Sequence, residues 1–271
     1  MMIEVLNAAV AAIQAGKSAA LATVVESSGA TPAKPGFKML LTEDGVRVGT
    51  VGGGALEHKV LETAREVLAQ RRSSRLALTE DCGGLSNLGM PCGGGIEVFV
   101  EYLTAGPEVC IFGGGHVGVA VAELAAFAGF RVVLVDDREE FANAERAPFA
   151  HDVHVYDMPE FASGYSGGPD RYVVIVTRGH SFDEQVLEAV LRQDPLPFYV
   201  GMMGSKSKVD NCFASLRGRG IPDEVIGCVH APIGLPIGGD TPREIAVSIV
   251  AEMVAARHGR DTRSSYLHTS S

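Results

Sequence analysis

The sequence predicts an α/β protein in which an N-terminal α+β domain precedes a Rossmann-like domain with a doubly wound parallel sheet. In the C-terminal half, short apolar runs alternate with amphipathic helical patterns, as in a parallel sheet covered by helices. A Gly113-x-Gly115-x-x-Gly118 loop joins the first of these strands to the first helix. The pattern changes after 104–107, a short run of small residues. The expected domains are therefore 1–105 and 106–260, followed by a polar, mobile tail over 261–271.

The N-terminal domain begins with a helix whose apolar residues Ile3, Leu6, Val10 and Ile13 share one face and which Gly16 closes. The segment 27–36 is rich in Gly, Ser and Pro, so we expect a loop there. A hairpin turn is expected at 43–45, and a helix is expected to open at Gly52-Gly53-Gly54. Strands are expected at 19–25, 37–41, 46–51, 75–78 and 96–103.

The C-terminal domain contains six candidate strands that are nearly all apolar, which is typical of parallel strands covered on both faces. A helical stripe over 117–128 ends at Gly129. Ser181 and Glu184 have the spacing of a capping box, and so do Thr241 and Glu244. The strands are expected at 109–112, 132–135, 153–156, 172–176, 198–201 and 225–229, in the spatial order 3-2-1-4-5-6.

Composition excludes several classes of protein. The 33 acidic residues outnumber the 23 basic ones and give a net charge of -10, which argues against a nucleic-acid partner. The N-terminus has no basic region of a secretory signal, and no apolar run reaches the roughly 20 residues that span a bilayer. The five cysteines are an odd number, which argues against a disulfide framework. We expect a cytoplasmic protein without a membrane partner.

The glycine loop after the first Rossmann strand is the leading candidate for a phosphate-binding site. Gly113 permits the tight turn, Gly115 lets backbone N–H groups reach a pyrophosphate, and Gly118 lets helix and strand pack closely. The N-terminus of the following helix adds about half a positive charge. The alternative is that the loop is inherited from the fold and binds nothing.

Three polar residues accompany this loop. Asp136 and Asp137 follow the second strand, where either carboxylate could hold a ribose diol. His116 lies in the loop itself. A histidine satisfied within the loop and a functional histidine fit the sequence equally well.

Three further clusters, at 177–180, 201–206 and 231–240, follow Rossmann strands at the edge where open α/β sheets place their ligands. Arg178 and Lys206 would supply cationic contacts in an otherwise acidic protein. Each cluster could equally be an ordinary loop, but their convergence on one edge favours a site. The candidate ligand contacts are Arg178, His180, Gly204, Ser205 and Lys206.

The N-terminal domain offers two more glycine-rich segments. Gly52-Gly53-Gly54 opens a helix that carries Glu57 in its first turn and could cradle an anion, although a tight turn explains these glycines as well. Cys92, followed by Gly93 and Gly94, and Cys82 are thiols in loops that a soft metal or a sulfur donor could reach. Their spacing fits no zinc motif. Cys110, Cys212 and Cys228 are expected to be core residues.

Seven sequence blocks in order resemble the xanthine dehydrogenase accessory protein family (XdhC/CoxI) over nearly the whole chain. They are GATPAKPGFKML, GTVGGGALE, NLGMPCGGGIEVFVE, VCIFGGGHVG, VVLVDDR, VGMMGSKSK and HAPIGLPIGGDTPREIAVSIVAEM. The resemblance implies a non-catalytic maturation factor that binds the molybdenum cofactor (molybdopterin). Such a factor protects the cofactor while a cysteine desulfurase helps supply its terminal sulfur, and passes it to a molybdenum hydroxylase apoenzyme. A homodimer is also implied.

The chain departs from the family pattern at two positions. Ala55 stands where many members have cysteine, and Ala33 stands where many have arginine. The first departure places in doubt any mechanism that needs a thiol at that helix start, and the second removes a phosphate contact. Cys92 matches the pattern, so a thiol role is carried over to Cys92 first.

Two other functions fit parts of the sequence. An NAD(P)-dependent oxidoreductase would use Gly113, Gly115, Gly118 and Asp136 for the dinucleotide and His180 as the proton donor. A protein-interaction scaffold would bind no ligand and would expose a substantial apolar patch.

Overall fold

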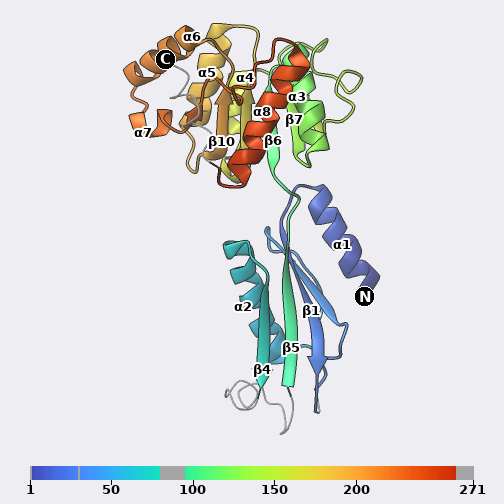
Figure 1. The fold of residues 1–271 in the computed structure, drawn as a ribbon. Coiled ribbons are helices and arrows are strands. Elements are labelled where there is room, and N and C mark those ends of the chain that lie inside the picture. The colour runs from blue at the N-terminus through green and yellow to red at the C-terminus, as the bar shows by residue number, and fades with distance from the viewer. Residues whose placement is uncertain (1, 30, 80–94, 261–271) are drawn as a thin grey trace. The chain divides into compact units, whose positions relative to one another are not determined.

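The computed structural model describes residues 2–29, 31–79 and 95–260 (Figure 1). The expected tail, 261–271, lies outside these ranges. The chain divides into two compact units, Met1–Ala105 and Gly106–Ser271. The first unit contains an antiparallel sheet and the second a parallel sheet, which confirms the predicted α/β fold class.

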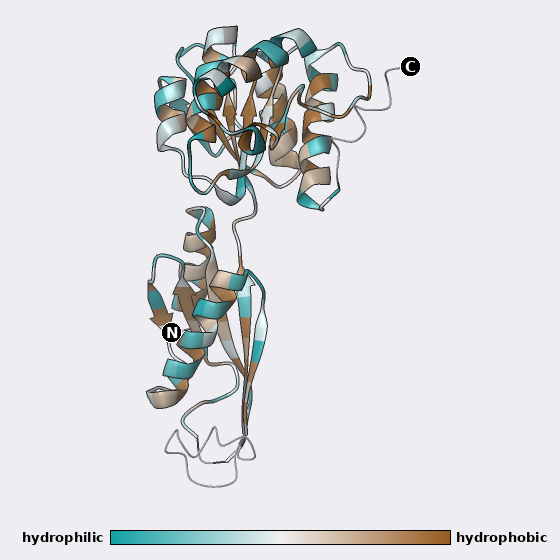
Figure 2. Ribbon diagram, turned by 90° about the vertical axis from the view of Figure 1, so that its left-hand side faces the viewer, coloured by the Kyte–Doolittle hydropathy of each residue, from teal (hydrophilic) through white to brown (hydrophobic). Residues whose placement is uncertain are grey.

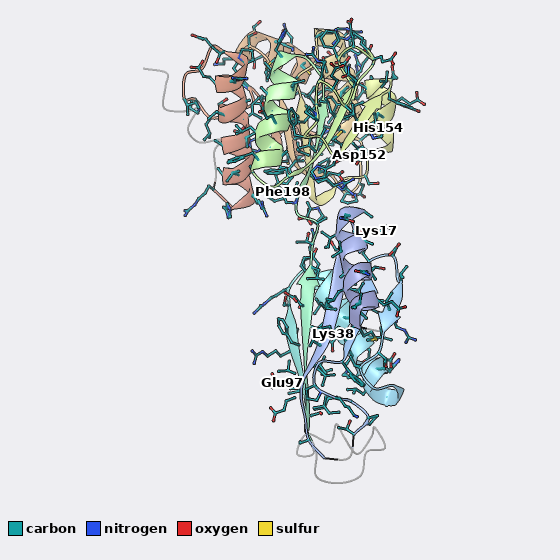
Figure 3. The ribbon with its side chains drawn as sticks, turned by 90° about the vertical axis from the view of Figure 1, so that its right-hand side faces the viewer. Lys17, Lys38, Glu97, Asp152, His154 and Phe198 are labelled. Carbon is teal, nitrogen blue, oxygen red and sulfur yellow. The ribbon has the colours of Figure 1, made fainter. Side chains whose placement is uncertain are left out.

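The first unit is a five-stranded sheet with the order β3-β2-β1-β5-β4 and one helix on each face. Alternate residues of β1 face opposite sides: Ala20 packs with α2, and Ala19 packs with α1. On β1 and β2, Lys38 Nζ donates to Oγ1 of its cross-strand partner Thr23 at 2.7 Å (Figure 3). The elements are α1 Met2–Gln14, β1 Ala19–Ser27, β2 Lys38–Thr42, β3 Arg47–Gly49, α2 Gly54–Gln70, β4 Ser74–Thr79 and β5 Gly95–Leu103.

The apolar stripe noted in the sequence of α1 is not the face that contacts the sheet. The helix contacts the sheet through Val5, Ala9 and Ala12, whereas Ile3 is 71% exposed and Val10 is 55% exposed. The small side chains allow α1 to lie close to the strands, and its larger apolar side chains point outward. Gly16 does close the helix, with a φ of 74° that favours glycine.

The second unit is a six-stranded sheet with the order β11-β10-β9-β6-β7-β8. Read from the other edge, this is the predicted doubly wound order. The strands are the most hydrophobic part of the unit, as Figure 2 shows. They are β6 Glu108–Phe112, β7 Arg131–Asp136, β8 Asp152–Val155, β9 Gly168–Ile175, β10 Pro197–Met202 and β11 Val229–His230.

Helices cover both faces of this sheet. On one face, α3 and α8 pack side by side over Val109, Ile111 and Val174 (Figure 1). The other face packs against α4, α5 and α6 around Phe112 and Ile175. The helices are α3 His116–Phe127, α4 Met158–Gly164, α5 His180–Leu191, α6 Lys206–Gly218, α7 Asp223–Ile226 and α8 Pro242–Arg257.

Three local predictions in the second unit are wrong. The segment 225–229 is not a continuous strand, because Pro222 starts the short helix α7 and only Val229 and His230 pair with β10. Ser181 does not cap α5, because that helix begins at His180 and its N-cap residue is Gly179. Cys228 is exposed rather than a core residue, whereas Cys110 and Cys212 are buried as predicted.

The capping box at Thr241 and Glu244 is present at the start of α8. None of the helices in the described ranges is long and apolar enough to cross a membrane.

Candidate functional site

The glycine loop lies at the switch point of the parallel sheet. Strands β6 and β9 are direct neighbours, with Phe112 opposite Ile175. After β6 the chain passes to α3 on one face, and after β9 it passes to α5 on the other face. The connections therefore part between these two strand ends, where open α/β sheets form their ligand-binding crevice.

Of the three glycines in the Gly113-x-Gly115-x-x-Gly118 pattern, two are required by packing and Gly115 leaves space. An added Cβ on Gly113, whose φ is 112°, would lie 2.5 Å from the Val176 carbonyl oxygen. An added Cβ on Gly118 would lie closer than 3.0 Å to the Gly113 carbonyl oxygen, which real Cβ atoms essentially never do. At Gly115 an added Cβ meets nothing within 4 Å. Gly115 therefore borders open space at the start of α3.

The helices on either side of the switch point begin without side-chain caps. Glycine occupies the N-cap position of both α3 and α5, and neither helix has a side-chain cap hydrogen bond. By contrast, Asp157, Ser205 and Thr241 cap α4, α6 and α8 with their side chains. The first-turn N–H groups of α3 and α5, and the positive ends of their dipoles, are therefore left for an anion.

Asp136 positions the glycine loop. Its carboxylate is 1% exposed and accepts a hydrogen bond from the Gly114 N–H at 2.8 Å. Arg138 binds the same carboxylate through Nε and Nη2, at 2.9 and 3.0 Å. Burial would raise the pKa of Asp136, but the bonds from Arg138 and Gly114 outweigh it and hold that pKa below its ordinary value. Both carboxylate oxygens thus have partners within the protein.

Asp137 and Arg178 form an ion pair across the end of β6. The two guanidinium nitrogens lie 2.8 and 2.7 Å from the two carboxylate oxygens. Asp137 follows β7 and Arg178 follows β9, and these strands flank β6 on either side. Arg178 is partly exposed and packs over the Phe182 ring. The structure thus places the cation predicted from sequence beside the glycine loop.

A buried network fixes the turn that carries Arg178. Asp183 accepts hydrogen bonds from the Thr177 hydroxyl at 2.6 Å and the Thr177 N–H at 3.2 Å. Lys208 pairs with the other oxygen of Asp183 and donates to the Met203 carbonyl oxygen at 3.1 Å. The ends of β9 and β10 are thereby tied together. The Lys208 contact was missed from sequence, because it joins two helices that are distant in the chain.

The other residues that the sequence predicts as ligand contacts at this edge lie at or next to the starts of helices α3, α5 and α6. Ser205 caps α6 by accepting from the Lys208 N–H, and Gly204 packs against the Lys208 side chain. Lys206 is exposed in the first turn of α6. His116 is exposed at the first position of α3, and His180 is the first residue of α5.

The 231–240 loop is anchored by Glu252 of α8, which is 1% exposed. Its carboxylate accepts from the Tyr199 hydroxyl at 2.7 Å and from the Gly234 N–H at 2.8 Å, and lies 3.2 Å from His230 Nδ1. Burial would raise the pKa of Glu252, but the bonds from His230, Tyr199 and Gly234 outweigh it and hold that pKa below its ordinary value.

Glu252→Gln is expected to destabilise the second unit by about 3 kcal/mol, because it removes a charge that several buried donors share. A lowered folded-state pKa gives stability that is present above the unfolded value of about 4.3 and is lost as the pH falls through the folded value. Wild type should therefore lose more free energy of unfolding between pH 6 and pH 3 than Glu252→Gln. Urea unfolding at both pH values measures this, with the exposed Glu224→Gln as control. Equal losses in wild type and Glu252→Gln would contradict the assignment.

In the first unit, the Gly52-Gly53-Gly54 segment packs against the 27–36 loop, which contains Ala33. An added Cβ on Gly52 would lie 2.9 Å from the Ala33 nitrogen, so the two segments pack backbone to backbone. Gly53 is the N-cap of α2, without a side-chain cap, and both Gly53 and Gly54 border open space. Glu57 accepts from the Thr50 hydroxyl at 2.9 Å and lies 3.3 Å from an Arg47 nitrogen.

Cys82, Cys92, Gly93 and Gly94 lie outside the described residues. Within the described ranges, no group of three His, Cys, Asp or Glu side chains is placed to hold a metal ion.

Comparison with known protein families shows which family the chain belongs to. Residues 109–253, more than half of the chain, match the XdhC Rossmann domain, and residues 12–79 match the XdhC and CoxI family. The chain belongs to the XdhC and CoxI family. The resemblance carried by the seven sequence blocks is thereby confirmed.

Three curated proteins are similar to this XdhC family chain. The uncharacterized protein YqeB of Escherichia coli K12 is 33% identical over 240 residues, covering 88% of this chain and 43% of YqeB. A protein of Bacillus subtilis 168 named as a probable xanthine dehydrogenase component is 28% identical over 161 residues, covering 59% of this chain and 46% of that protein. The molybdenum cofactor insertion chaperone PaoD of E. coli K12 is 24% identical, covering 93% of this chain and 88% of PaoD. The chain thus spans less than half the length of the first two relatives.

Proposed function

We propose that this XdhC family chain binds the molybdenum cofactor as cargo and delivers it to a xanthine dehydrogenase-type molybdenum hydroxylase. The observation that carries the proposal is the pair of uncapped helix starts, α3 and α5, on either side of the Gly113–Gly115 loop. The names of two relatives, a molybdenum cofactor insertion chaperone and a probable xanthine dehydrogenase component, supply the cargo and the client.

The donors at the switch point suit the phosphate of molybdopterin. First-turn N–H groups of α3 and α5 would donate to the phosphate oxygens, and Gly115 leaves room for their approach. Arg178 would exchange Asp137 for the phosphate, because a guanidinium binds both anions with the same two-pronged geometry. The exchange removes Asp137 as a competitor without leaving a buried charge unpaired, since both side chains are partly exposed.

The resemblance extends the proposal to other steps. In the cytoplasm, the chain would hold the cofactor while a cysteine desulfurase helps supply its terminal sulfur. The chain would act as a homodimer and would not itself catalyse a reaction. Cys92 is the thiol that a sulfur-handling role would use first, with Gly93 and Gly94 beside it.

A nicotinamide-dependent oxidoreductase is the weaker proposal. The Gly113, Gly115 and Gly118 pattern favours it, but a dinucleotide also needs an acceptor for its ribose diol. Asp136, the acid at the fingerprint position, already binds Gly114 and Arg138 with both oxygens. A ribose would have to displace these partners.

Substitutions of the two members of the Asp137–Arg178 ion pair are expected to change the affinity for molybdopterin differently. Arg178→Gln should weaken molybdopterin binding about tenfold or more, because a charge-assisted hydrogen bond contributes about 1.5–3 kcal/mol. Asp137→Asn should bind as tightly as wild type or tighter, because it removes the competing anion. The amount of cofactor transferred to apo-hydroxylase, from the chain loaded with limiting molybdenum cofactor, should be lower for Arg178→Gln than for wild type and Asp137→Asn.

Arg217→Gln, which removes an exposed cation near the C-terminal end of α6, serves as the charge-matched control and distinguishes a loss of one positive charge from a loss of Arg178. Equal transfer yields for wild type and Arg178→Gln would contradict the proposed phosphate contact. Absence of transfer by every form of the chain would contradict the delivery function itself.

A further inference from the structure

Helices α3 and α8 carry an apolar hollow on the side that faces away from the sheet. The hollow has a volume of about 490 Å³, and its lining includes Leu124 of α3 and Ala246 and Val247 of α8. Phe127 also lines it and is 89% exposed. An aromatic ring this exposed contributes nothing to the core of its own unit, so it is free to contact another molecule.

The residues of the hollow follow helical spacing. On α3 they are Ala120, Glu123, Leu124 and Phe127, and on α8 they are Arg243, Ala246 and Val247. Positions three and four apart lie on one side of a helix, so each helix contributes one continuous stripe. The two helices pack side by side, so the stripes form a single surface, the α3–α8 surface (Figure 1).

Opposite charges lie on the two helices of this surface. Glu123 is exposed on α3 and Arg243 is exposed on α8. Within the described residues, neither side chain has an ion-pair partner, although both line the same hollow. The α3–α8 surface therefore carries an acid on one helix, a base on the other and apolar side chains between them.

We infer that the α3–α8 surface binds a second copy of this chain about a twofold axis. In this arrangement α3 of one copy lies along α8 of the other, which a twofold axis permits because it pairs the same surface with itself. Glu123 then meets the second copy's Arg243, and Arg243 meets its Glu123. Phe127 of each copy enters the hollow of the other, where burial of its ring stabilises the pair by about 1.5–3 kcal/mol. This gives the proposed homodimer a contact surface, and it does not depend on cofactor binding.

The oligomeric states of the chain and of its charge-reversal variants test the inference. Sedimentation equilibrium over a range of concentrations should give a dimer for wild type. Glu123→Arg and Arg243→Glu should each raise the dimer Kd about tenfold or more, because each change creates two like-charge contacts in a symmetric interface. The double variant Glu123→Arg/Arg243→Glu should restore dimerisation, because both contacts regain opposite charges.

Phe127→Asp should give a folded monomer, since the side chain is exposed in one copy, and its unfolding midpoint should not depend on protein concentration as that of the wild-type dimer does. Val155→Asp is the matched control. Val155 is 49% exposed on the edge strand β8, which Asp152 and His154 mark in Figure 3, and it does not line the hollow. This variant should remain a dimer.

Three results would overturn the inference: a wild-type monomer at all concentrations, a Phe127→Asp variant that dimerises like wild type, or a double variant that dimerises no better than the single ones. A monomer that instead binds the hydroxylase through Phe127 would also overturn it, since the surface would then serve the client. Molybdopterin binding, measured on the same variants, reports separately on the proposed function.

Discussion

Gly118→Ala is expected to destabilise the second unit by about 3 kcal/mol or more. The added methyl would collide with the Gly113 carbonyl oxygen, and backbone at the junction of β6, the glycine loop and α3 cannot move away as a flexible side chain can. Urea unfolding of the full chain measures the effect. Gly115→Ala is the matched control, because it adds the same methyl in the same loop where nothing lies within 4 Å. Similar unfolding midpoints for the two variants would contradict the described packing.

Gly115→Val is expected to leave the fold intact and to weaken anion binding at least tenfold. Its branched side chain would occupy the open space at the start of α3, through which a phosphate must pass to reach the first-turn N–H groups. Isothermal titration with inorganic pyrophosphate measures the loss, and urea unfolding verifies the fold.

Gly164→Val is the control for that titration. Gly164 lies at the end of α4, and an added Cβ there also meets nothing within 4 Å. Pyrophosphate binding that is unchanged in Gly115→Val would show that the ligand lies elsewhere, whereas an equal loss in both variants would point to a nonspecific effect.

The strand order and the place of the glycine loop could be predicted from sequence because they depend on local patterns. Parallel strands read as apolar runs, and the loop glycines occur at a fixed spacing after the first of them. The structure assigns distinct physical reasons to these glycines: Gly113 and Gly118 avoid backbone collisions, while Gly115 leaves space.

Other features could not be predicted because they depend on competition between similar alternatives. In α1, both Ile3 and Val5 belong to helical apolar stripes, and only contact with the closely packed sheet selects Val5, Ala9 and Ala12. In 225–229, the β-branched Val225 indicated a strand, but Pro222 and the acids after it start a helix.

The side-chain contacts of the site could not be predicted from patterns in the sequence. Asp136 and Asp137 are adjacent and identical, yet the first turns inward to Gly114 and the second turns to Arg178. The contact of Asp183 with Lys208 joins residues from different helices. Such pairings follow from the three-dimensional placement of strand ends, which no spacing within the chain specifies.

Equilibrium binding of molybdopterin to the full chain, with NADP as a competitor, tests the central claim most directly. We predict saturable binding that Gly115→Val and Arg178→Gln weaken about tenfold or more, that Gly164→Val leaves unchanged and that NADP does not displace. If molybdopterin does not bind, or if NADP alone binds and Gly115→Val abolishes its binding, the second unit is not a carrier of the molybdenum cofactor.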